Sequence, residues 1–142
     1  MRTKLTILFI TSFLSLAHLG LYLVPSAPPK DVDLKVLKVD GVWKVVLASD
    51  YSKTQVKVKK NDKITWLVVG TDADFQFPQD LLDPAAPEDS LKNGDTKFVD
   101  DGKKLKLKIK GSAEPGTYEY SVFCLADSVY AIGGSPPKII VE

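Results

Sequence analysis

The sequence has almost none of the side chains that bind transition metals or act as nucleophiles. Its 142 residues include one histidine, His18, one cysteine, Cys124, and one methionine, Met1. Zinc fingers, binuclear copper centres and Cys-His nucleophile pairs each need several such residues together, so this composition excludes all three. A single cysteine also excludes a disulfide within the chain, and the hydrophobic core must therefore hold the fold.

The chain also lacks a strong charge of either sign. Nineteen basic residues are balanced by 18 acidic ones, and the formal net charge is +1. A nucleic-acid-binding domain normally carries a clear excess of basic charge on one face. The composition therefore predicts no nucleic-acid partner, and it contains no strongly acidic tail.

The N-terminal segment reads as an export signal. Arg2 and Lys4 precede an uncharged run from residue 5 to residue 24. This pattern predicts a signal peptide over residues 1–26, or an uncleaved anchor, since the run is close to the roughly 20 residues that cross a bilayer. Both readings place the protein in the periplasm or outside the cell. Membrane contact is expected only through an uncleaved segment 5–24.

The rest of the chain shows the period-two alternation of β-strands and no sustained helical periodicity. Asp40-Gly41 lies between two apolar runs, which is a strong hairpin signal. In the run 104–110, leucine and isoleucine alternate with lysine, which predicts one buried and one solvated face. The runs 55–59 and 63–69 are expected to pair as neighbours. Together these patterns predict an all-β, Greek-key, two-sheet β-sandwich of about seven or eight strands over residues 34–142, after a linker at 27–33.

The segment from residue 70 to residue 95 is irregular and acidic. Apart from a short strand at Asp74–Phe77, it is expected to contain at most one helical turn, around Gln79 to Leu82. A solvated acidic loop is the favoured interpretation, and a site for a hard cation such as Ca²⁺ is the alternative. The acids concerned are Asp72, Asp74, Asp80, Asp83, Glu88 and Asp89.

Three stretches resemble the cupredoxin family, which has the plastocyanin and azurin fold. They are the strand ending in Trp66 (KNDKITW), the segment ending in Tyr120 (PGTYEY) and Cys124. The resemblance implies a type 1 copper site made by two histidines, a cysteine and usually a methionine. Cys124 matches the ligand cysteine, but the first histidine position falls near Ala73 to Phe75, where there is no histidine. The chain therefore lacks the copper-ligand histidines, and no cofactor is expected.

Cys124 is expected to be a buried core thiol, because free cysteine is among the most buried residue types. The alternative is a metal ligand. The aromatic residues Trp43, Trp66, Tyr118 and Tyr120 are likewise expected in the core. No catalytic residue is predicted, since neither Ser121 nor Ser128 has a histidine base in the domain.

These observations favour an exported, non-enzymatic, copper-free cupredoxin-like domain that acts as a binding or structural module. Its partner would be a protein or a small ligand, and the oligomeric state is left open. The loops 70–95 and 125–137 are expected at one end as the contact surface, with candidate contact residues Phe75, Phe77, Asp127 and Tyr130.

Two other functions stay open at this stage. The first is a carrier of copper or another cation that uses Cys124 with loop carboxylates, of which Asp72 and Asp74 are the candidates. The second is an electron-transfer protein.

Overall fold

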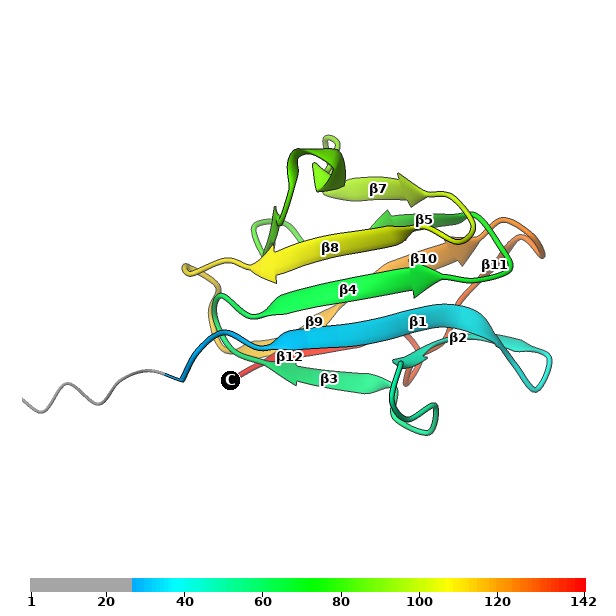
Figure 1. Ribbon diagram of the computed structural model, residues 1–142, viewed down its shortest axis with the longest axis horizontal. Coiled ribbons are helices and arrows are strands. Elements are labelled where there is room, and N and C mark those ends of the chain that lie inside the picture. Colours follow the sequence, from blue (N-terminus) through cyan, green and yellow to red (C-terminus); the bar gives the residue numbers. More distant parts are fainter. Residues whose placement is uncertain (1–26) are drawn as a thin grey trace, which may run out of the picture.

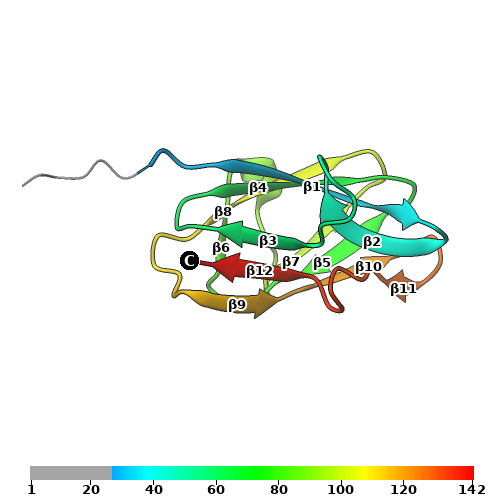
Figure 2. The same ribbon diagram turned by 90° about the horizontal axis from the view of Figure 1, so that it is seen from below.

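The computed structural model describes residues 27–142, which form two packed layers of β-strands (Figures 1 and 2). The first layer is a single five-stranded sheet, in the order β2 (Val42–Leu47), β1 (Asp31–Val39), β4 (Lys63–Val68), β8 (Lys104–Ile109) and β6 (Leu82–Pro84). The predicted all-β sandwich is confirmed. The predicted signal peptide or anchor lies outside the described residues, and none of the helices within 27–142 is long and apolar enough to cross a membrane.

The second layer consists of two smaller sheets. One contains β11 (Val129–Tyr130), β10 (Ser121–Cys124), β5 (Ala73–Gln76) and β7 (Thr96–Val99), in that order. The other contains β3 (Gln55–Val58), β12 (Lys138–Val141) and β9 (Gly116–Glu119). From β2 to β9 every connection crosses from one layer to the other, so consecutive strands lie in different sheets of the sandwich.

Local patterns account for the first layer. Asp40 and Gly41 both have positive φ, so the β1–β2 turn has the backbone that an Asp-Gly hairpin requires. In β8 the side chains of Leu105, Leu107 and Ile109 are fully buried, whereas the lysines between them reach solvent. The predicted alternation of this strand is confirmed.

The core is centred on four aromatic side chains that join the layers. The ring of Trp66, in β4, lies 5.2 Å from Phe77 and 5.8 Å from Tyr120 between centroids, and Phe75 completes the group. The Trp66 indole N–H donates to the Tyr120 hydroxyl at 3.0 Å. The bond gives the buried indole nitrogen a partner, so no polar cost offsets the apolar burial.

The predicted pairing of runs 55–59 and 63–69 is wrong. β3 pairs in parallel with β12 in the second layer, whereas β4 lies in the first layer between β1 and β8. The turn at residues 60–62 therefore connects the layers and is not a hairpin. The Asp62 carboxylate, which is almost fully buried, holds this turn by accepting from the amides of Lys30 and Lys59.

The strand boundaries differ from the prediction at three more places. β1 begins at Asp31, so part of the predicted linker pairs with β4; the charges of Asp31 and Asp33 hid its alternation. The segment around Gln79 to Leu82, predicted to form at most one helical turn, is a tight turn that leads into the edge strand β6, and a 3-10 turn follows at Pro87–Asp89. The single predicted strand 117–124 is divided at Tyr120, whose amide bonds to the Pro137 carbonyl between the two sheets.

Candidate functional site

The loops at one end of the sandwich, on the right in Figure 1, form an interlocked surface that we call the loop end. It is made of the β1–β2 turn, the β4–β5 loop, the β7–β8 loop and residues 125–132. The sequence predicted that the loops 70–95 and 125–137 lie together at one end, and this prediction is confirmed only for part of each loop. Residues 77–95 run from the opposite end of β5 and belong elsewhere in the fold, as do residues 133–137, which lead into β12.

The β4–β5 loop is the centre of the loop end. The Thr71 hydroxyl, almost fully buried, donates to the Asp72 carbonyl and accepts from the Ala126 amide at 3.0 Å. One oxygen of the Asp72 carboxylate accepts from the Asp101 amide at 2.8 Å. The carboxylate of Asp101 in turn accepts from the Gly70 amide at 2.7 Å. These polar groups hold three loops together and leave Asp72 with a structural role.

Asp127 fixes the loop that follows β10. Its carboxylate accepts from the Trp43 indole N–H at 2.6 Å and forms an ion pair with the Lys38 ammonium at 2.5 Å. Both contacts hold the pKa of Asp127 below its usual value, and the contact with Lys38 has the larger effect. Backbone bonds between Ile132 and the β2 residues Trp43 and Val45 close the same loop onto the first layer.

Cys124 lies beneath the loop end with its side chain fully buried, which confirms the expected core thiol. It stands opposite Ala73 in the β10–β5 pair. Burial, followed by the nearby charge of Asp127, raises the pKa of the thiol to about 11. At neutral pH the sulfur is therefore protonated, and it is the thiolate that binds metals.

The candidate metal ligands do not come together. Asp74 stands opposite Phe123 on the solvent face of β5, whereas Cys124 faces the core. Asp80 and Asp83 pair with Lys110, and Asp89 accepts from the Lys106 amide. Within residues 27–142 no three histidine, cysteine or acidic side chains are grouped as ligands. Since type 1 copper also needs two imidazoles, the donor set of this domain does not fit that ion.

The four candidate contact residues differ in their placement. Tyr130 is the most exposed of them, with 64% of its surface accessible, and Asp127 lies in the loop end. The choice of Phe75 is wrong, because its side chain is fully buried in the core. Phe77 is 4% exposed and also packs in the aromatic core. In the predicted strand Asp74–Phe77, residues 75 and 77 share one face, and the structure shows that this face points into the core.

The sequence reasoning missed two outward-facing aromatic residues, Phe98, which is exposed, and Phe123, which is half-buried. Phe123 lies between the inward-facing Val122 and Cys124, and Phe98 lies beside the buried Val99. Because successive side chains of a strand point to opposite faces, both phenylalanines point to solvent. The period-two alternation of the two strands would have predicted that Phe98 and Phe123 face solvent.

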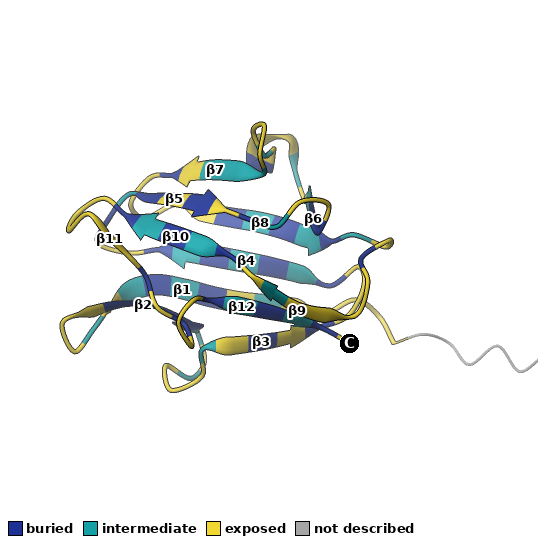
Figure 3. Cartoon of the chain, turned by 180° about the vertical axis from the view of Figure 1, so that it is seen from behind, coloured by how far each residue is buried: buried dark blue, intermediate teal, exposed yellow. Residues whose placement is uncertain are grey.

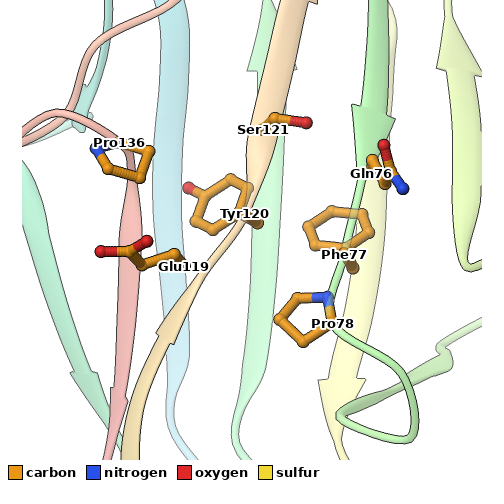
Figure 4. A pocket seen from close by; sticks show the side chains of 7 residues that line it. All are labelled: Gln76, Phe77, Pro78, Glu119, Tyr120, Ser121 and Pro136. Carbon is orange, nitrogen blue, oxygen red and sulfur yellow. The ribbon is translucent and has the colours of Figure 1, made fainter.

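A hollow of about 360 Å³ opens on the second layer where its two sheets separate (Figure 4). Its floor consists of Phe77 and Tyr120, whose rings stack at 5.4 Å. The rim contains Gln76, Pro78, Glu119, Ser121 and Pro136. The Tyr120 hydroxyl already accepts the Trp66 bond, and burial raises the pKa of this phenol well above its usual value. The hollow is thus the outer side of the aromatic core.

No protein-family model matches this chain, and the search of curated proteins finds no significant match. Solved structures of amicyanin are similar to it. One mutant of amicyanin in its Cu(I) form matches 82% of this chain and 85% of that chain, at 16% identity and a TM-score of 0.40. A reduced mutant matches the same shares at 15% identity and a TM-score of 0.41. Amicyanin is a cupredoxin, the family whose motifs the sequence resembles.

Proposed function

We propose that this protein is an exported, non-enzymatic binding domain that works without copper and contacts its partner through the loop end. One observation carries the proposal: exposed apolar side chains gather at that end. Of the eight large hydrophobic side chains exposed within residues 27–142, six belong to it, namely Val42, Val69, Leu125, Val129, Tyr130 and Ile132. Clusters of exposed apolar surface on soluble domains mark sites of interaction.

The loop end is also fixed before any partner arrives. The bonds around Thr71 and Asp72, and the two contacts of Asp127, tie the loops to one another and to β2. A surface whose loops are already ordered loses little conformational entropy on association. This property supports a recognition role for the loop end.

The chemistry of Cys124 supports the copper-free part of the proposal. Its thiol is buried and protonated at neutral pH, and the Thr71 hydroxyl and one oxygen of the Asp72 carboxylate are engaged in hydrogen bonds between loops. The sequence has no histidine after His18 to complete a ligand set or to serve as a general base. The proposed export rests on the uncharged run of residues 5–24.

Photo-crosslinking tests the proposed contact surface. A photoreactive benzoylphenylalanine at position 129, in cells that make the protein, is expected to yield one discrete crosslinked product. Ser112 is the matched control position, since it is exposed in the β8–β9 loop at the opposite end. The proposal fails if position 129 yields no product, or if both positions yield the same one.

A further inference from the structure

Three aromatic side chains and one carboxylate form a straight row across the outer face of the second layer. In the strand register, Tyr130 of β11 stands opposite Phe123 of β10, Phe123 opposite Asp74 of β5, and Asp74 opposite Phe98 of β7. Directly opposed residues share one face of a sheet. Figure 3 views this face, with the four strands side by side. We call these four residues the aromatic row.

The aromatic row is open to solvent. Tyr130 and Phe98, at its two ends, are 64% and 46% exposed, and Phe123 is partly exposed between its neighbours. The Phe123 and Tyr130 rings meet edge to face at 5.1 Å. Phenylalanine on a solvated sheet face carries apolar area that the fold itself does not fully bury. The contacting pair of Phe123 and Tyr130 lies on one side of Asp74, and Phe98 lies on the other.

Asp74 gives the aromatic row a charge at its centre. Its side chain is exposed and makes no ion pair or side-chain hydrogen bond within residues 27–142. Asp80 and Asp83 face Lys110, whereas Asp33 and Asp40 are exposed acids that, like Asp74, have no such partner in the described part of the chain. Asp74 is distinguished by its position between two phenylalanines of neighbouring strands. A carboxylate with a phenylalanine on each side complements a cation that has apolar flanks.

Arginine fits this description best among protein side chains. Its guanidinium forms two parallel hydrogen bonds with a carboxylate, and its flat faces stack on aromatic rings. The aromatic row spans three gaps between strands, or about 14 Å, which matches about four residues of an extended chain. The next row on the same face is polar, with Ser121, Gln76 and Thr96 opposite one another, so it offers partners to a peptide backbone.

The ring geometry argues against a sugar as the occupant. A sugar chain that stacks on several rings in succession is best matched by aromatic faces that lie in one plane, whereas the Phe123 and Tyr130 rings are inclined at 69°. Asp74 is a charged acceptor, and a sugar hydroxyl donates a single hydrogen bond to it without supplying a positive charge. A cationic side chain with apolar parts complements both the charge of Asp74 and the phenylalanine rings beside it.

We propose that the aromatic row binds an extended, arginine-containing segment of a protein partner, with the guanidinium on Asp74 between Phe98 and Phe123. This inference rests on the proposed binding role and names the chemistry of what is bound. Phe98 and Phe123 cover the apolar part of the arginine side chain and the residues beside it. Tyr130 belongs both to this row and to the loop end, so one partner can contact the two surfaces together.

The test is a peptide titration of the ¹⁵N-labelled full chain, kept in solution by a nonionic polyoxyethylene detergent and followed by NMR. The probe is a five-residue peptide in which valine and arginine alternate. We expect it to shift the amides of β5, β7 and β10. A peptide with citrulline, the neutral isostere of arginine, is expected to bind at least about tenfold more weakly, because the charge-assisted pair with Asp74 is lost.

Two variants make the outcome specific. Asp74→Asn should remove the difference between the arginine and citrulline peptides, whereas Asp33→Asn should preserve it. Asp33 is also an exposed strand acid, and it lies on the outer face of the other layer. Equal affinity for the two peptides, absence of shifts in the three strands, or shifts caused there by cellohexaose and not by the arginine peptide would each overturn the inference. If any of these results occurred while position 129 still gave a discrete crosslinked product, the arginine-binding inference would fail but the proposed function would remain supported.

Discussion

Replacement of Trp66 by alanine is expected to lower the free energy of unfolding by about 3–5 kcal/mol, the usual range for a fully buried aromatic residue. The ring of Trp66 is fully buried and contacts Phe75, Phe77 and Tyr120, which belong to the opposite layer. Its loss leaves a cavity between the layers and removes the hydrogen bond to the Tyr120 hydroxyl. Urea unfolding followed by far-UV circular dichroism measures the change.

Trp66→Phe separates the two contributions of this side chain. Phenylalanine retains most of the apolar volume but has no N–H, so the Tyr120 hydroxyl is left buried without its donor. We expect a smaller loss, about 1–3 kcal/mol. If alanine at position 66 costs less than about 1 kcal/mol, the size of an ordinary surface change, then Trp66 does not join the two layers as described.

Cys124 is expected to react with a disulfide reagent such as DTNB about 100-fold more slowly than an exposed thiol at neutral pH. This factor is the difference in thiolate fraction between a pKa of about 11 and the ordinary value of 9.0. Burial of the sulfur slows the reaction further, since the reagent must reach it.

The comparison is made with the same chain unfolded in urea, where Cys124 is exposed and its pKa is ordinary. Because the pKa in the folded protein is raised, the thiolate should appear only near pH 11, and the rate should keep rising with pH up to that point. A folded protein that reacts as fast as the unfolded one at pH 7 would show that Cys124 is accessible and ionised.

Short-range patterns of the sequence predicted those parts of the fold that are determined locally. Asp40 and Gly41 formed the expected turn because both adopt positive φ, a conformation that few other residue pairs allow. The alternation in β8 predicted its buried face, because side chains of a strand point to opposite sides. Neither inference depends on what the strand pairs with.

Pairings between distant segments could not be predicted in the same way. β3 and β4 are separated by a short turn, yet they lie in different layers, and nothing in the turn itself distinguishes a hairpin from a crossing. The break at Tyr120 arises because the strand changes partner, from β12 to β5. Edge strand β6 has only three residues and contains Pro84, so it shows no periodicity.

Only those parts of the candidate site that depend on residue type and strand position could be predicted from the sequence. The burial of Cys124 followed from its residue type and its strand position. By contrast, Asp127 owes its role to Trp43, which lies 84 residues away, and Ala126 bonds to Thr71, 55 residues away. Contacts of this kind depend on the tertiary arrangement of the loops, so they cannot be predicted from the sequence of either loop alone.

The central claim is that the loop end is held together by its polar groups and does not bind copper. The most direct test equilibrates the full chain with one equivalent of copper, removes the free ion and measures the metal bound by elemental analysis. We predict only trace copper, equal in the natural protein and in Cys124→Ser, and no intense visible colour. One copper per chain that turns the protein blue and is lost in Cys124→Ser would contradict the claim.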